Sequence, residues 1–143
     1  MAIHIQQPVF DPWQLVRDRE VGQGADIRTR AGAAAVFVGC MRDFNQGLPV
    51  PAMTLEHYPG MTEGYLRKVE TEARQRWELL DTLIVHRFGP ILPAEPIVLV
   101  AVWSSHRDAA FAACRYLIDE LKTRAPFWKQ EQTSSGLRWV DPE

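Results

Sequence analysis

The residues best suited to chemistry lie close together in the segment LKTRAPFWKQE, which spans residues 121–131. The chain holds 13 arginines but only three lysines, and two of these, Lys122 and Lys129, fall within this segment. Arginine stays protonated, whereas a lysine can lose its proton when burial or like charges lower its pKa. Both lysines are therefore candidates for acid–base or nucleophilic chemistry. Taken alone, composition favours a simpler interpretation as two solvated charges, with Lys122 favourably placed at a helix C-terminus.

A second group of residues is suited to binding an anion. Ser105, His106 and Arg107 stand at the expected start of a helix, where free backbone N–H groups and the positive end of the helix dipole attract phosphate. His106 and Arg107 would add side-chain donors for the same ligand. Arg42, which follows an apolar strand, could reach into a pocket at the end of that strand. The alternative for each is an ordinary surface residue.

The cysteines and the other histidines give weaker indications. Cys40 and Cys114 lie far apart without a Cys-x-x-Cys or Cys/His pattern, which argues against a zinc site and against a disulfide framework. Cys40 is a possible nucleophile, but a cysteine in an apolar strand more often serves packing. His57 and His86 fall in expected strands and are interpreted as structural. This use of cysteine favours a reducing, cytoplasmic setting.

Bulk composition excludes several classes of function. A chain of 143 residues fits one domain, which we expect to span residues 1–143. The formal net charge of -2 argues against a protein that coats nucleic acid or an anionic membrane. No apolar run is long enough to cross a bilayer, and the N-terminus lacks the pattern of a secretory signal. Phe127, Trp128 and Trp139 indicate a core or an interface, because no basic stripe accompanies them.

The elements that must position these residues are strands and helices in mixed order, which predicts an α+β (mixed α/β) fold. A short helix is expected to begin at Asp11 and to end at the glycines of 22–24. Apolar residues recur every four positions over 61–77, which predicts a second helix. A third helix is expected to begin with Ser105 as N-cap and Asp108 as its capping-box partner, and to end before Pro126. Strands are expected at 31–40, 53–58, 82–88 and 97–103, a loop at 42–51, and a hairpin in which 127–132 pairs with 137–140.

Four motifs make the chain resemble a known family, the large subunit of molybdopterin synthase. They are VFVGCMRDFNQG, LEHYPGMTE, SSHRDAAF and LKTRAPFWKQE, and they occur in family order between Ala31 and Val140. The resemblance implies an α/β hammerhead fold with an added antiparallel β subdomain. It also implies a homodimer in which each large subunit holds one small ubiquitin-like subunit, so that the assembly is a heterotetramer.

The resemblance further implies a reaction. The small subunit carries a thiocarboxylate on its C-terminal Gly-Gly tail, which enters the active site of the large subunit. The substrate is cyclic pyranopterin monophosphate, and two sulfur transfers with opening of the cyclic phosphate yield molybdopterin. No metal or organic cofactor is implied, because the sulfur arrives on a protein tail.

Site residues follow from the same motifs. Lys122 and Lys129 match the catalytic lysines of the family, and Phe37 matches an aromatic residue near the pocket. The expected substrate contacts, besides the two lysines, are Cys40, Met41, Arg42, His106, Arg107, Gln130 and Glu131. Cys40 stands where the family often has lysine, and Gln130 replaces a frequently basic residue, so the anion pocket is expected to be less positive than usual. Cys40 is not expected to carry sulfur.

Two alternatives to this function stay open at the level of sequence. One is a non-catalytic binding module that holds a ubiquitin-like tail or an anionic ligand. Loss of one lysine would leave the partner affinity of such a binder intact, since it has no reaction to lose. The other is an acyltransferase that acts on different thiocarboxylates and would use the same lysines.

Overall fold

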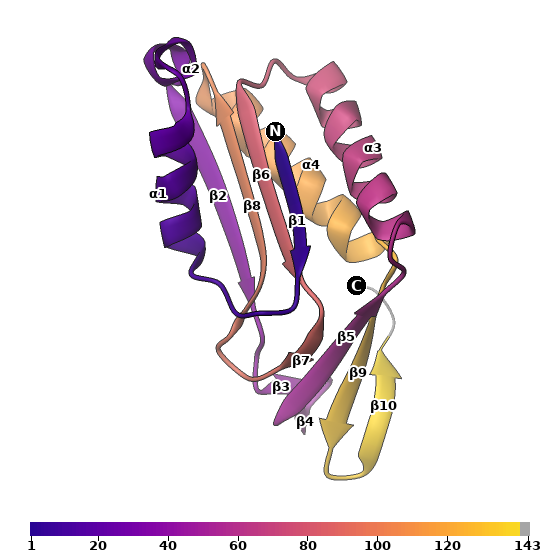
Figure 1. Ribbon diagram of the computed structural model, residues 1–143. Helices are drawn as coiled ribbons and strands as arrows, with labels where there is room; N and C mark the ends of the chain where they lie inside the picture. Colours follow the sequence, from indigo (N-terminus) through magenta and orange to yellow (C-terminus); the bar gives the residue numbers. More distant parts are fainter. Residues whose placement is uncertain (141–143) are drawn as a thin grey trace.

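The computed structural model describes residues 1–140, which contain four helices, two four-stranded β-sheets and a short two-stranded hairpin (Figure 1). The expected domain boundary at residue 143 and the ordering of the tail after Val140 lie outside the described residues. Within residues 1–140, no helix is long and apolar enough to cross a membrane.

The helices are α1 (Pro12–Gly22), α2 (Ala25–Arg30), α3 (Met61–Arg76) and α4 (Arg107–Thr123). The strands are β1 (Ala2–Gln6), β2 (Ala33–Cys40), β3 (Phe44–Asn45), β4 (Leu48–Pro49), β5 (Ala52–His57), β6 (Asp81–Arg87), β7 (Gly89–Ile91), β8 (Pro96–Ser104), β9 (Phe127–Thr133) and β10 (Gly136–Val140).

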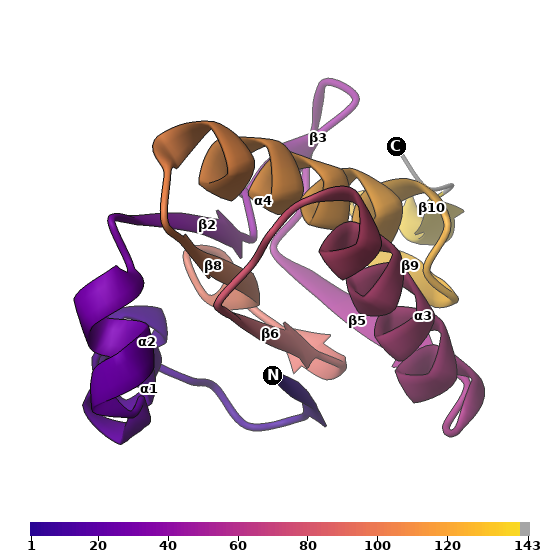
Figure 2. The same ribbon diagram turned by 90° about the horizontal axis from the view of Figure 1, so that it is seen from above.

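The main sheet has the strand order β1-β6-β8-β2 and is covered on both faces (Figure 2). Alternate residues of a strand point to opposite faces, so Ile84 and Val100 pack in the cluster under α3 and α4. Leu83 and Leu99 belong to the opposite cluster, which includes residues of α1. Burial on both faces explains why β8 has a nearly continuous apolar sequence instead of an alternating one.

Helix α4 is held along the main sheet by one apolar stripe. The stripe contains Ala110, Ala113, Cys114, Leu117, Ile118 and Leu121, which recur with helical spacing and are all buried. The helix ends at Thr123, shortly before Pro126, a residue that cannot continue it. Its C-terminal end therefore lies next to the second sheet, where β9 begins (Figure 1).

The second sheet has the order β10-β9-β5-β7, and its strands pair in antiparallel fashion. It has its own small core, in which Met41, Val50, Met53, Leu55 and Ile91 are buried. This sheet confirms the predicted antiparallel β subdomain, and the whole arrangement confirms the predicted α+β fold.

Most predicted elements are confirmed, but the loop expected at 42–51 is wrong. It contains the hairpin of β3 and β4, in which Phe44 pairs with Pro49 and Asn45 with Leu48. The two residues that join these strands, Gln46 and Gly47, have φ values of 53° and 76°. Positive φ at both central positions is what a tight two-residue hairpin requires. The strands β1 and β7 and the helix α2 were not predicted.

The predicted capping box of the third helix is also wrong. His106, not Ser105, is the N-cap of α4, because its backbone is extended at φ -130° and ψ 148°. No side-chain hydrogen bond caps this end of the helix. In contrast, the predicted N-cap of α1 is confirmed, since the Asp11 carboxylate accepts hydrogen bonds from the backbone N–H groups of Trp13 and Gln14.

A buried carboxylate ties the N-terminus of the chain to the main sheet. Asp81 is 3% exposed, and its oxygens accept hydrogen bonds of 2.8 Å from Arg19 and 2.9 Å from Gln23. The amino group of Met1 lies 3.2 Å from the same carboxylate. Burial alone would raise the pKa of Asp81, but the hydrogen bonds from Arg19, Gln23 and the N-terminus outweigh it and lower the pKa to about 2.

Replacement of Asp81 by asparagine is therefore expected to destabilise the fold by about 2 kcal/mol at neutral pH. The Asp81 carboxylate has a lower pKa in the folded chain than the ordinary value of 3.8, so its stabilisation is fully present above that value. It is lost as the pH falls towards 2. Denaturant unfolding should show a difference between wild type and Asp81→Asn that shrinks over this range. The exposed pair of Asp26 with Arg30 supplies the control, because Asp26→Asn should change little at any pH. A difference that does not depend on pH would contradict the prediction.

Candidate active site

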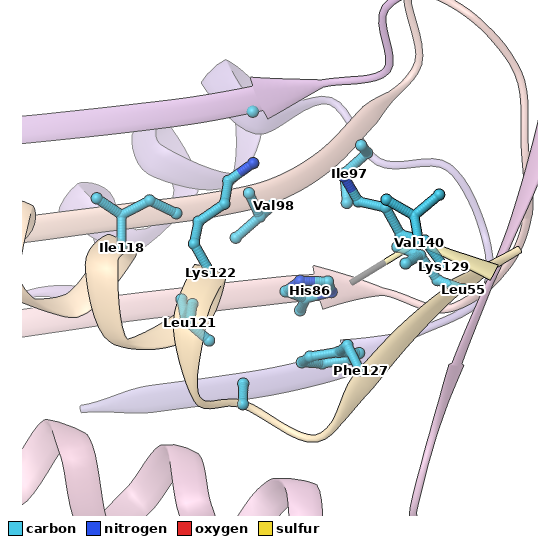
Figure 3. A pocket seen from close by; sticks show the side chains of 12 residues that line it. Leu55, His86, Ile97, Val98, Ile118, Leu121, Lys122, Phe127, Lys129 and Val140 are labelled. Carbon is cyan, nitrogen blue, oxygen red and sulfur yellow. The ribbon is translucent and has the colours of Figure 1, made fainter. Parts of the chain in front are cut away.

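Two pockets meet where the end of α4 faces the second sheet. The first, called here the apolar pocket, has walls made mainly by Leu55, Ile97, Val98, Ile118, Leu121 and Phe127 (Figure 3). The second, called here the polar pocket, is lined by Cys40, Met41, Arg42, Phe44, Asn45, Met53 and Glu131, among others. Ile97, Lys122 and Lys129 line both pockets. The two lysines therefore stand at the boundary between an apolar space and a cationic one.

The two lysines reach this boundary from different elements. Lys122 lies in the last turn of α4, directly after the buried Leu121, and its side chain is exposed. Lys129 is the third residue of β9, pairs with Leu55 of β5 and is half-buried. Lys122 is exposed and Lys129 only half-buried, so full desolvation of these side chains must come from a molecule that fills the pockets. The prediction that these lysines share one site agrees with their placement.

The buried carboxylate of Glu131 organises the polar pocket. Glu131 follows Lys129 by two residues on β9, so both side chains lie on the same face of the sheet. It is 4% exposed and accepts hydrogen bonds of 3.1 Å from the Asn45 amide and 3.0 Å from the Arg138 guanidinium. Arg138 also donates to the carbonyl oxygen of Asn45 at 2.9 Å. This network fastens the hairpin of β3 and β4 to the second sheet, beside the lysines.

The residues around Arg42 form the rim of the polar pocket. Arg42 is exposed, and its guanidinium carbon lies 5.2 Å from the centre of the Phe44 ring. Met41 is buried, whereas Cys40 is exposed at the end of β2, where a bulge shifts the pairing with β8. The interpretation of Cys40 as a packing residue is therefore wrong. Three cations border this pocket, and its carboxylate is bonded to Arg138, so the pocket is suited to an anionic ligand.

His86 is a lining residue of the apolar pocket whose place in the site was not predicted. Its Nδ1 lies 2.8 Å from the carbonyl oxygen of Arg87, and its ring stacks on Phe127 with centroids 3.7 Å apart. Burial lowers the pKa of His86 to about 4, and the charges of Lys122 and Lys129 act in the same direction. His86 is therefore neutral at physiological pH. The structural role expected for it is correct but incomplete.

Three of the predicted contact residues do not lie in these two pockets. His106 and Arg107 are exposed at the opposite end of α4, and the rise of an α-helix places Arg107 about 22 Å from Lys122 along its axis. Gln130 lies between Lys129 and Glu131 on β9, and therefore faces the other side of the second sheet. Phe37 lines a groove between β2 and α4 that Lys122 also borders.

No cluster of three or more potential metal ligands among His, Cys, Asp and Glu occurs in residues 1–140. The chemical groups that the two pockets bring together are two primary amines, a guanidinium, a neutral imidazole and a hydrogen-bonded carboxylate. Such a set can bind a phosphate, move protons and stabilise developing negative charge.

Comparison with known proteins gives a consistent result. The family model described as MoaE protein matches residues 10–124, a span that includes Lys122 and stops before Lys129. The molybdopterin synthase catalytic subunit of Pseudomonas aeruginosa is 53% identical over 141 residues, which cover 99% of this chain and 91% of the relative. The solved MoaE protein of Burkholderia ambifaria MC40-6 is 46% identical with a TM-score of 0.80, covering 99% of this chain and 90% of that one. The crystal structure of molybdopterin synthase from Staphylococcus aureus is 30% identical with a TM-score of 0.82, covering 96% and 95%.

Proposed function

The chain belongs to the MoaE protein family, as its motifs predicted, and on this basis we propose that it is the large, catalytic subunit of a molybdopterin synthase. In this role it converts cyclic pyranopterin monophosphate to molybdopterin. Each of the two sulfur atoms comes from the thiocarboxylated Gly-Gly tail of a small ubiquitin-like subunit, so the two transfers consume two thiocarboxylates. The enzyme is thus a sulfurtransferase whose donor is a second protein.

The observation that carries this proposal is the position of Lys122 and Lys129 at the boundary of two unlike pockets. A tail without bulky side chains fits the apolar pocket, and a phosphorylated pterin fits the polar pocket with Arg42 at its rim. The acyl carbon of the donor and the reacting carbon of the acceptor then meet beside the two amines. A single pocket of either kind would not bring both reactants to the same lysines.

The roles of the lysines follow from this placement. Lys122 acts on the reacting atoms, either as acid and base or by transient attack on the acyl group. Lys129 stabilises the negative charge that develops when the cyclic phosphate opens. Glu131 holds the hairpin that carries Asn45 in place and lies beside the bound substrate. No resident metal or organic cofactor takes part, because the sulfur is delivered by the partner subunit.

The separation of the two ends of α4 supports a homodimeric site. His106 and Arg107 cannot approach a substrate held by Lys122 of the same chain, because they stand at the opposite end of α4, a rigid helix of 17 residues. If all of these residues contact one substrate, His106 and Arg107 must come from a second copy. The uncapped N-terminus of α4 would then offer its free backbone N–H groups to the phosphate. With one small subunit on each copy, the assembly is a heterotetramer.

We also place the enzyme in the cytoplasm. Cys40 and Cys114 form no disulfide, and Cys40 is exposed, which suits a reducing compartment. The partners are the small subunit, a second copy and the pterin, with no membrane or nucleic acid involved.

Reconstitution tests the proposed function directly. The purified chain, mixed with a thiocarboxylated small subunit and the cyclic pterin, is expected to form the dithiolene product. The same chain mixed with the cyclic pterin and inorganic sulfide, without the small subunit, should not form product at a comparable rate, because its two cysteines provide no sulfur relay. Product should be followed by mass spectrometry of the released pterin. Equal rates with sulfide and with the small subunit would overturn the proposed donor.

A further inference from the structure

The hydrogen bond of His86 determines which of its ring nitrogens carries the proton. A carbonyl oxygen can only accept, so Nδ1, at 2.8 Å from the Arg87 oxygen, must be the donor. In the neutral ring, Nε2 is then an acceptor with a lone pair. Stacking on Phe127 fixes the plane of the ring. Because Nδ1 donates to the main chain, Nε2 is the polar atom of His86 that is available to a group in the apolar pocket.

Few groups in the apolar pocket can donate to this nitrogen. Within residues 1–140, the polar side chains that line the pocket are His86, Lys122 and Lys129. Both lysines lie near His86 in the close view (Figure 3). The donors available to Nε2 in this pocket are therefore the two lysine amines, and Lys122 is the one whose orientation matters for the proposed reaction.

We propose that His86 is a positioning residue whose Nε2 accepts a hydrogen bond from the Lys122 amine during the reaction. This inference rests on the proposed function, because it assumes that Lys122 reacts. The choice of acceptor has a chemical reason. A carboxylate in the same place would orient the amine but would also hold its proton by charge attraction. A neutral imidazole orients the amine and leaves it able to give up that proton.

Two substitutions separate this role from a purely structural one. The side-chain amide of glutamine can reach the position of Nε2, whereas that of asparagine can reach only the position of Nδ1. His86→Gln should therefore keep the acceptor in the pocket, and His86→Asn should keep only the bond to Arg87. We expect kcat to fall about 30-fold in His86→Asn and less than about 5-fold in His86→Gln, with KM for both substrates nearly unchanged. Equal activity of the two variants, or higher activity of His86→Asn, would overturn the proposal.

A measurement on the unmutated ring covers the case in which these variants fold poorly. Nitrogen NMR of histidine-labelled protein, saturated with the cyclic pterin and with a small subunit that lacks the sulfur, should show Nδ1 protonated and Nε2 as a hydrogen-bonded acceptor. Lys122→Ala should shift the Nε2 resonance towards that of a free acceptor, whereas Lys129→Ala should leave it nearly in place. An Nε2 signal that does not respond to Lys122→Ala sinks the proposal. This readout needs no turnover, so it stands apart from failure of the reconstituted reaction.

Discussion

Lys122→Ala is expected to lower kcat by about 1,000-fold, the range typical for loss of a general acid–base group. The fold and the affinity for the small subunit should change little, because the side chain is exposed and the buried stripe of α4 ends at Leu121. Single-turnover assays with saturating donor would measure the chemical step, and calorimetry would measure the affinity. Loss of affinity without loss of kcat would favour the non-catalytic binding module instead.

Lys122→Arg decides between chemistry and electrostatics. Arginine keeps the positive charge but does not readily give up a proton. If Lys122 transfers a proton or attacks the acyl carbon, the arginine variant should be nearly as inactive as the alanine variant. If Lys122 only holds the phosphate, much of the activity should remain. Lys68 is an exposed lysine on α3, outside both pockets, so Lys68→Ala is the matched control and should behave as wild type.

Mixed dimers of two inactive variants are expected to regain activity. Lys122→Ala and Arg107→Ala should each be strongly impaired as homodimers, because every site lacks one essential group. A mixed dimer has one site that lacks both groups and one site that is intact, provided that Arg107 comes from the other copy. With random pairing in a symmetric dimer, about a quarter of wild-type activity should return. Coexpression of the variants with different tags would isolate the mixed dimer.

The control for this experiment pairs variants of two residues that line the same pocket of one copy. A mixed dimer of Lys122→Ala and Lys129→Ala should regain nothing, since both lysines serve the same pocket within one copy. Activity that stays at the level of the separate variants in the first mixture would contradict a site shared between copies. Light scattering that gives the mass of one chain at micromolar concentration would also count against it.

The sequence predicted best those parts of the fold that have a strong local period. The helices at 61–76 and 107–123 carry one continuous apolar stripe each, so their positions were predicted to within a few residues. Strand β1 was missed because AIHIQ is short and mixed in polarity, and because its pairing with β6 joins residues about 80 positions apart. The hairpin at 44–49 was missed because only its turn residues gave a signal, and they suggested a loop.

Only part of the site could be predicted, because local sequence does not give the distances between residues. Motif resemblance indicated Lys122, Lys129 and Arg42, but a motif does not say how far apart its residues lie. The helical rise placed His106 and Arg107 at the far end of α4, and strand alternation placed Gln130 on the other face. His86 lies inside the apolar run TLIVHRF, where nothing in the local pattern distinguishes a residue that lines a pocket from one that only packs.

Strand β9 gives this enzyme two surfaces that can change independently during evolution. Lys129 and Glu131 face the pockets, whereas Trp128 packs edge-on against Tyr58 on the opposite side, 4.4 Å between ring centres. A single-residue insertion inside β9 would exchange the two sets and abolish the site, while an insertion of two residues would restore the facing. Substitutions at Gln130 can instead accumulate without changing the residues that line the pockets. Directed evolution of solubility should therefore begin on that outer face.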